Sequence, residues 1–337
     1  MVNTSSVLQV WNKEIDSYIE DELDVMPPSI YKQLTSYVTN KDIYNYDATI
    51  SGYSPMHEVG EGGNAINNDP VEGFVTPYYL KEYRDGTTFT STVLETDRHD
   101  RVSLQARQWA RLPEYTRDIN AMSVLRRGWD TTFTWGDSLQ LISTAHPSKK
   151  GATQYNTFFD GVQLPLDYDN AVALEGVQGE IVSNSQNLLS VGDENRNKIL
   201  VVPFALREKA FQIAGVNGPD LKPDTAENNS NYFRKGARYD VIVTKFLGWN
   251  IATQMGETAV ARTSTSNYYD STWFIVDQAL AQKYFRFMNF PGYPNFTEET
   301  QIENGNIYKV AADKYKFGAS GWFWIVGSKG DNSTFSS

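Results

Sequence analysis

A stripe of mostly apolar side chains between residues 97 and 129 is the strongest constraint that this sequence places on its fold. The stripe has the spacing of one helix face and consists of Val102, Ala106, Trp109, Thr116, Ile119, Met122 and Leu125. Asp97 or Asp100 suits its beginning and Gly128 its end. Pro113 falls inside the pattern and lacks the backbone N–H that a helix interior needs. We therefore predict a long helix over 97–128 that kinks or breaks near residues 109 to 113.

The N-terminal segment, residues 1–47, predicts an amphipathic helix with little core of its own. Its apolar positions follow helical spacing and are Val7, Leu8, Trp11, Ile15, Tyr18 and Ile19. We expect such a segment to lie on another surface and to be removable without unfolding the rest of the chain. The alternative is an ordinary helix that packs on its own domain.

Charge is distributed unevenly along the chain. The whole chain has 30 Lys and Arg against 41 Asp and Glu, a formal net charge of -11. Residues 97–129 contain seven arginines and four acids, a local excess of +3. An acidic cluster lies in the N-terminal segment and consists of Glu14, Asp16, Glu20, Asp21, Glu22 and Asp24. This contrast predicts that the acidic segment and the basic helix meet, and the alternative is a solvated charged face.

Two runs rich in β-favouring residues, 74–83 and 87–94, predict a hairpin. They flank Asp85-Gly86, a pair that is typical of a hairpin turn. Neither face is strongly apolar, and an isolated two-stranded hairpin is marginal in water. We therefore expect the hairpin to rest on a neighbouring surface, in this chain or in another copy. The glycines before it, Gly60, Gly62 and Gly63, are interpreted as a flexible hinge.

Beyond residue 129 short extended runs alternate with helical ones. Short extended pieces are expected at 131–135 and 138–144, and helices after Asp169 and from Pro203. Further strands are expected at 198–202, 239–247, 272–276 and within 306–327, with a polar loop at 250–270. The sequence therefore predicts a mixed α+β chain, and it has no fixed-period repeat.

The composition is that of a folded protein without disulfide bonds. The chain has 337 residues, of which 40% are hydrophobic, enough for about two domains. It has no cysteine, which excludes a disulfide framework, a thiolate metal site and a cysteine nucleophile. No apolar run approaches the ~18 residues that span a bilayer, and the first residues do not resemble a secretory signal. We expect cytoplasmic synthesis, no membrane partner and, given the acidity, no tight grip on a phosphate backbone.

The residues that usually carry catalysis are scattered. Residues 60–65 match the dinucleotide fingerprint only in part, and Pro70 prevents a long helix from following them. His57, His99 and His146 stand singly, and His146 before Pro147 is interpreted as a structural turn residue. The sequence therefore predicts no enzyme activity, no catalytic residue, no cofactor and no metal site.

Three stretches resemble one protein family. Residues 136–147 read GDSLQLISTAHP and are followed by Gly151 and Asn156; residues 200–203 read LVVP; and residues 315–324 read YKFGASGWFW, followed by Gly327 and Gly330. In this order they are similar to the Mu-like major head subunits of tailed bacteriophages. The resemblance implies the Hong Kong 97-type capsid fold, which has an N-terminal arm, an extended hairpin loop, a peripheral domain with a long spine helix, and an axial domain.

The resemblance also implies a division of the chain. The expected ranges are 1–47 for the arm, 48–95 for the hairpin loop, 96–197 for the peripheral domain with its spine helix at 97–128, 198–295 for the axial domain, and 296–337 for the return to the peripheral domain and the C-terminus. Pro113 departs from the family's pattern and puts the straightness of the spine helix in question.

The implied function is structural. The resemblance implies that many copies form hexamers and pentamers of an icosahedral shell around double-stranded DNA, with the chain located in the virion. Residues expected to contact neighbouring subunits are Trp11, Ile15, Lys81, Glu82, Arg84, Arg107 and Arg111. Expected partners are other copies, a separate scaffolding protein, a portal, a cement or decoration protein, and packaged DNA in non-specific contact.

Two alternatives stay open at this point. Within the same fold, the chain could form an encapsulin-like bacterial nanocompartment that encloses enzymes instead of DNA. From another class, its many Trp and Tyr residues would suit a carbohydrate-binding β protein. The long helix predicted at 97–128 counts against that second reading.

Overall fold

The computed structural model describes residues 4–50, 56–65, 67, 69, 72–96, 100–148, 153–181, 197–215, 239–257, 268–301 and 306–335. Their helices are α1 Thr4–Val25, α2 Tyr31–Leu34, α3 Ser91–Thr96, α4 Arg101–Ala110, α5 Leu112–Arg126, α6 Tyr168–Glu180, α7 Arg207–Ala214, α9 Trp249–Gln254 and α10 Gln278–Tyr284. Their strands are β1 Ser36–Thr39, β2 Tyr44–Ile50, β3 Glu72–Tyr79, β4 Lys81–Phe89, β5 Lys198–Pro203, β6 Tyr239–Thr244, β7 Trp273–Asp277, β8 Phe285–Asn289, β9 Asn295–Gln301, β10 Asn306–Ala319 and β11 Ile325–Ser328.

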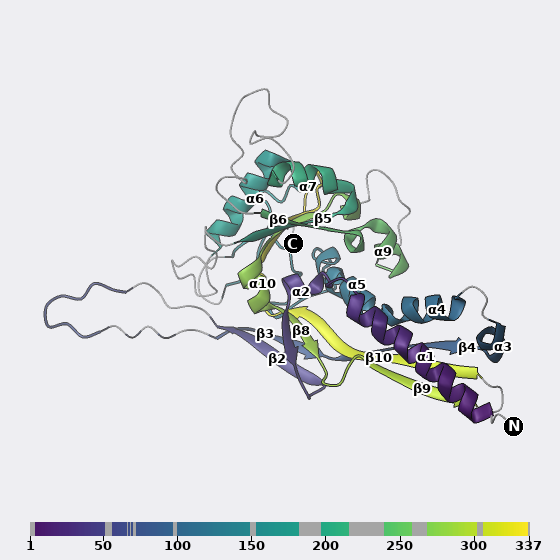
Figure 1. Ribbon diagram of the computed structural model, residues 1–337. Helices are drawn as coiled ribbons and strands as arrows, with labels where there is room; N and C mark the ends of the chain where they lie inside the picture. The colour runs from purple at the N-terminus through teal and green to yellow at the C-terminus, as the bar shows by residue number, and fades with distance from the viewer. Residues whose placement is uncertain are drawn as a thin grey trace.

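Strand β10 organises the lower part of the molecule in Figure 1. It pairs with β4 along one edge and with β8 and β9 along the other, and β1 adds to β8 in parallel. Alternate β10 residues are buried, because successive side chains of a strand point to opposite faces. The helices α1, α4 and α5 run along this sheet (Figure 1).

A second sheet of four strands, in the order β11-β7-β5-β6, forms the upper part. Every residue of β5 and β7 is buried, as expected for the continuous apolar runs predicted at 198–202 and 272–276. Helices α6 and α7 lie over this sheet in Figure 1. One apolar cluster extends from β5 and β7 to Phe287 and Phe317 of the lower sheet, so the two sheets share a core.

The sheets do not follow two of the ranges that the resemblance implies. Strand β8 lies within 198–295 but pairs with β10 of the lower sheet. Strand β11 lies within 296–337 but pairs with β7 of the upper sheet. Strand pairing alone does not delimit a domain, so the domain ranges stay a prediction.

The long helix is broken where the sequence predicts a break. Helix α4 ends at Ala110, and α5 begins at Leu112 with Pro113 in its first turn. Proline is tolerated there because the first N–H groups of a helix have no partner within it. Asp100 precedes α4 but makes no side-chain capping bond, and Asp97 lies outside the described residues.

The predicted hairpin turn at Asp85-Gly86 is wrong. Strand β4 runs straight through both residues, which lie opposite Ala311 and Val310 of β10. The ring of Tyr308 lies against Gly86, and a Cβ atom on Gly86 would lie only 2.1 Å from the Tyr308 hydroxyl oxygen unless that side chain moved. Gly86 therefore permits a close approach inside a sheet, and it does not form a turn.

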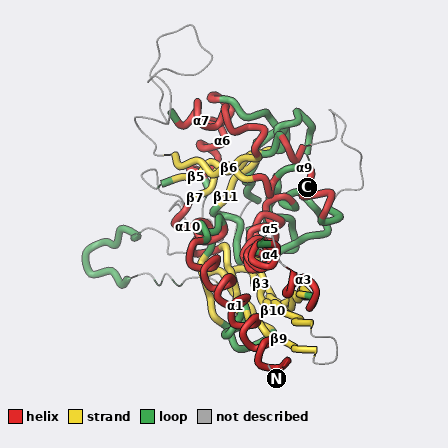
Figure 2. The backbone as a smooth tube through the Cα atoms, turned by 45° about the vertical axis from the view of Figure 1, so that its right-hand side comes forward, coloured by secondary structure: helices red, strands yellow, loops and turns green. Residues whose placement is uncertain are grey.

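The hairpin is formed instead by β2 and β3, which pair antiparallel. The described residues between them, 56–65, lie far outside the body of the molecule in both Figure 1 and Figure 2. The glycine-rich stretch that was expected to be a hinge contains a tight turn, in which the Gly63 N–H donates to the Gly60 carbonyl at 2.9 Å. Gly62 has a φ of 78°, a conformation that glycine adopts without strain.

The N-terminal helix packs on its own chain. The amphipathic helix predicted here is confirmed as α1, but Ile15 and Ile19 are 1% and 4% exposed and contact a cluster that includes Phe89, Val102 and Trp109. Further along, Leu34 of α2 is fully buried in the main core. The alternative of an ordinary packed helix therefore holds, and this packing argues against the expectation that residues 1–40 can be removed without unfolding the chain.

This packing predicts a clear cost for truncating the buried face of α1. We expect Ile15→Ala to lower the free energy of unfolding by about 2–4 kcal/mol, because it removes buried methyl groups and leaves a cavity. The matched control is Val10→Ala, since Val10 is on the same helix and 63% exposed, and its effect should stay within about 0.5 kcal/mol. Equal effects of the two substitutions in chemical denaturation would contradict the packing.

Candidate functional site

The acidic N-terminal segment and the basic helix meet, as their charges predict. Arg107 lies in α4, and Arg111 is the residue that follows this helix. Both arginines form ion pairs with Glu22 of α1, and a side-chain nitrogen of Arg107 also lies 3.7 Å from an Asp21 carboxylate oxygen. Glu22 is buried, whereas both arginines stay partly exposed. The charge contrast is therefore satisfied within one chain.

The remaining residues predicted to contact a neighbouring subunit differ in accessibility. Ile15 is covered by its own chain and offers no surface to a second copy, and Trp11 is partly covered by the same cluster. Lys81, Glu82 and Arg84 are exposed on β4. It stays a prediction that another copy is contacted by Trp11, by the three β4 residues, or by Arg107 and Arg111.

Strand β4 is an edge strand that carries charge along its length. Glu82 and Arg84 lie on the same face of the strand, and their side chains pair at 2.5 Å. Charged side chains on an edge oppose indiscriminate pairing with the sheet of another molecule. Any contact that β4 makes with another copy must therefore match this charge pattern.

The outer face of the β2–β3 hairpin is aromatic and exposed, a feature that the sequence reasoning missed. Tyr44, Tyr46 and Tyr79 are 46%, 64% and 61% exposed, and Val75 on the same face is also exposed. The ring centroids of Tyr44 and Tyr79 lie 4.7 Å apart. We call these four residues the hairpin aromatic face. The alternate spacing of Tyr44 and Tyr46 was the available signal, but it does not say which face is covered.

A buried cluster of charges connects α5 to β10. Arg117 donates two hydrogen bonds to Asp313, at 2.8 and 3.0 Å, and a third to Glu114 at 2.8 Å. Burial alone would lower the pKa of Arg117, but the hydrogen bonds and charge of Asp313 outweigh it and raise the pKa. Burial raises the pKa of Asp313, and the hydrogen bonds and charge of Arg117 oppose that shift. The two hydrogen bonds between Arg117 and Asp313 fix the helix on the sheet.

Asp118 joins the same helix to the segment after α1. Its Oδ1 accepts the Tyr31 N–H at 3.0 Å, at the start of α2. Desolvation by burial raises the pKa of Asp118 to about 6, and the nearby charge of Glu114 adds to the shift. The ionised form of Asp118 is therefore disfavoured in the folded chain.

The raised pKa of Asp118 predicts a pH-dependent gain from Asp118→Asn. The ordinary pKa of an aspartate is about 3.9, so the folded natural chain gains stability as the pH falls through about 6 and loses it as the pH rises. The asparagine keeps an acceptor for Tyr31 and has no charge to bury. We expect the variant to melt a few degrees higher than the natural chain at pH about 8 and no higher at pH about 4. A variant that melts lower at both pH values would contradict this.

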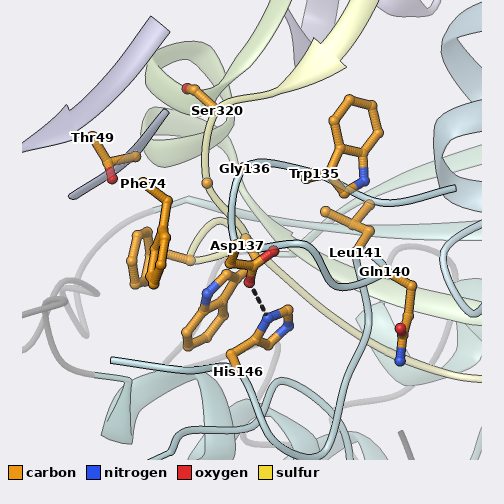
Figure 3. Close-up of a pocket in the computed structure, with 12 residues that line it drawn as sticks. Thr49, Phe74, Trp135, Gly136, Asp137, Gln140, Leu141, His146 and Ser320 are labelled. Carbon is orange, nitrogen blue, oxygen red and sulfur yellow. Dashed lines mark hydrogen bonds and ion pairs between the residues drawn. The ribbon is translucent and has the colours of Figure 1, made fainter. Parts of the chain in front are cut away.

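Asp137, His146 and Asn156 form a buried polar cluster, of which Figure 3 shows Asp137 and His146. His146 Nδ1 lies 2.7 Å from Asp137 Oδ2, and His146 Nε2 lies 3.2 Å from Asn156 Oδ1. The ring of Trp322 stacks on the imidazole with centroids 4.2 Å apart and planes 6° from parallel. His146 is thus a structural residue, held also by two backbone hydrogen bonds to Gln154.

This cluster lacks the parts of a hydrolytic centre. The second ring nitrogen of His146 faces an amide oxygen and no hydroxyl nucleophile, and the adjoining cavity of about 20 Å³ holds about one water molecule. Within the described ranges, no group of three or more His, Asp and Glu side chains could hold a metal ion. In that same part of the chain, every helix is too short or too polar to cross a bilayer.

Comparison with known proteins identifies the fold. No family model and no curated protein sequence matches the chain. The capsid structure of the cyanophage P-SCSP1u is similar over 89% of this chain and 87% of that one, with a TM-score of 0.53 and 11% identity. The capsid of bacteriophage JBD30 is similar over 66% of this chain and 91% of that one, with a TM-score of 0.50 and 12% identity.

These likenesses confirm the expected α+β fold of the Hong Kong 97-type capsid proteins. Identities this low show the fold alone, so the narrower resemblance to Mu-like head subunits stays a prediction. A virus-like particle from Pyrococcus furiosus is also similar, over 94% of this chain and 98% of that one, at a TM-score of 0.48 and 11% identity.

Proposed function

We propose that this chain is the major capsid protein of a tailed bacteriophage with a double-stranded DNA genome. Many copies would assemble as hexamers and pentamers into an icosahedral shell that encloses the genome. The observation that carries the proposal is the likeness to the cyanophage capsid, because it extends over 89% of this chain and 87% of the other. A structural likeness that covers nearly all of both chains includes the peripheral elements as well as the central sheets.

The hairpin aromatic face is the surface that we assign to contact between copies. Tyrosine is enriched in protein interfaces, where its ring supplies buried area and its hydroxyl a hydrogen bond. Three tyrosines about half exposed on one two-stranded face are costly for an isolated chain in water. The occupant that fits is a second copy, because the opposite face of the hairpin, with Thr76 and Tyr78, is already covered by its own chain and this face is left outward.

The exposed charges of β4 are the second surface assigned to assembly. Lys81, Glu82 and Arg84 present alternating charge on an edge strand, which favours one register of contact over others. Arg107 and Arg111 retain exposed surface beside Glu22 and can contribute in the same way. Each exposed ion pair contributes less than about 1 kcal/mol, so these charges select the partner more than they hold it.

If the chain forms a capsid shell, its location and its other partners follow. The chain would be located in the virion and have no enzymatic role. Its other partners would be a separate scaffolding protein, a portal and a cement or decoration protein. Contact with packaged DNA would be non-specific and weak, since a chain of net charge -11 cannot displace many counterions from the phosphate backbone.

A bacterial nanocompartment shell is the second candidate, because it would use the same fold. The carbohydrate-binding alternative requires a β-sandwich or β-helix, and the described chain has neither. The contents of purified particles separate the two shells. DNA favours the phage capsid, and an enclosed enzyme favours the nanocompartment.

Assembly itself is the first test. We expect the full-length protein, expressed in bacteria, to elute from size-exclusion chromatography as megadalton particles that electron microscopy shows as hollow, rounded shells. Co-expression with a matching scaffolding protein is the second arm, because some shells require one. A protein that stays monomeric or dimeric in both arms would overturn the proposal.

The hairpin aromatic face predicts a separation between folding and assembly. We expect the double variant Tyr46→Ser with Tyr79→Ser to melt within about 2 °C of the natural chain, because both side chains are exposed, and to lose most of its shells. The control is Phe159→Ser, since Phe159 is 79% exposed elsewhere on the surface. Normal particle yield from the double variant, or an equal loss from the control, would contradict the assignment.

A further inference from the structure

The orientation of the Asn156 amide is set by three hydrogen bonds. Its Nδ2 donates to the carbonyl oxygens of Leu141 at 2.8 Å and Ile325 at 3.2 Å, and both of these atoms can only accept. Its Oδ1 accepts the Ser143 N–H at 2.8 Å. A reversed amide would place acceptor against acceptor at two contacts and donor against donor at the third. The atom that faces His146 Nε2 is therefore an acceptor.

Both ring nitrogens of His146 then face acceptors. Asp137 Oδ2 lies 2.7 Å from Nδ1, and an ionised carboxylate cannot donate. A neutral imidazole has only one N–H, so it can satisfy one of these two contacts and not both. We infer that His146 carries a proton on both nitrogens in the folded chain and forms, with Asp137 and Asn156, a proton-dependent clamp at the junction of the two sheets.

The surroundings of His146 suit a buried cation. Asp137 supplies the countercharge, and its other oxygen accepts the Leu139 N–H at 3.1 Å. The face of the Trp322 ring, which carries partial negative charge, lies against the imidazole. Among the described residues that line the adjoining cavity, Asp137 and His146 are the two whose side chains can carry a charge.

The clamp lies where three parts of the fold meet. Trp322 belongs to the segment that leads from β10 of the lower sheet to β11 of the upper sheet. Asn156 holds the strand β11 that follows it: its side chain donates to the Ile325 carbonyl at 3.2 Å, and its own carbonyl accepts the Gly327 N–H at 3.1 Å. On the other side the backbone of Gly136 lies against Thr76 of β3, because a Cβ there would be 2.6 Å from the threonine hydroxyl.

Loss of one proton from His146 must release one of its two contacts. The buried acceptor left behind has no donor, which is costly away from water. The attachment of the 136–156 stretch to the β10–β11 crossover therefore weakens as the pH rises. This inference concerns the single chain and does not depend on the proposed function.

The direct test is the protonation state of the imidazole. Full-length protein labelled with ¹⁵N-histidine, studied by solid-state NMR so that assembled shells can be included, should show two protonated ring nitrogens for His146 at pH about 7. His146→Gln assigns the signal, and the exposed His57 is an internal reference. One protonated and one bare nitrogen at pH about 7 would overturn the inference.

The second test uses Asp137→Asn. The asparagine amide can donate to Nδ1 of a neutral His146, whose Nε2–H still donates to Asn156, so every contact is satisfied without the extra proton. We expect the melting temperature of the natural chain to fall by several degrees more than that of the variant between pH about 6 and about 9. His57→Gln is the matched control and should behave like the natural chain. An equal fall in the natural chain and in Asp137→Asn would overturn the inference, and the NMR test decides if that variant does not fold.

Discussion

The structure depends on how strand β10 is buried. Both of its edges are paired, with β4 on one side and β8 and β9 on the other, and one of its faces is covered by helices. The covered face carries two charged residues, Lys309 and Asp313, and each forms an ion pair with a helix. Lys309 pairs with Asp16 of α1 at 2.7 Å, and Asp313 pairs with Arg117 of α5. Because an unpaired charge at such positions would be costly, these two pairs specify where α1 and α5 lie on the sheet.

Much of the fold follows from local patterns in the sequence. The amphipathic α1, the break before Pro113, and the buried strands β5 and β7 were predicted because each depends on the spacing of its own residues. The turn at Asp85-Gly86 was predicted by the same kind of reasoning and is wrong, because both residues pair with β10, a strand far along the chain. Local sequence patterns identify helices and strands, but they do not show which distant element each of them will pack against.

The candidate surfaces show the same limit. The contact between the acidic segment and the basic helix could be predicted from charge, but its location inside one chain depends on the packing of Ile15 and Ile19. The hairpin aromatic face could not be predicted, since alternate tyrosines are equally consistent with a buried face. The three stretches that carry the family resemblance are consistent with one another in space: Asp137, His146 and Asn156 bind the segment around Trp322, and β5 lies in the sheet that this segment enters.

The break between α4 and α5 has a mechanical consequence. An unbroken helix resists bending along its whole length, because every turn is braced by hydrogen bonds to the next. Here the two helices meet at Arg111, and Pro113 removes one of the bonds that would brace the joint. The helical layer over the lower sheet would therefore bend most easily at this joint. The chain has a joint at Arg111, where an unbroken helix would form a stiff rod.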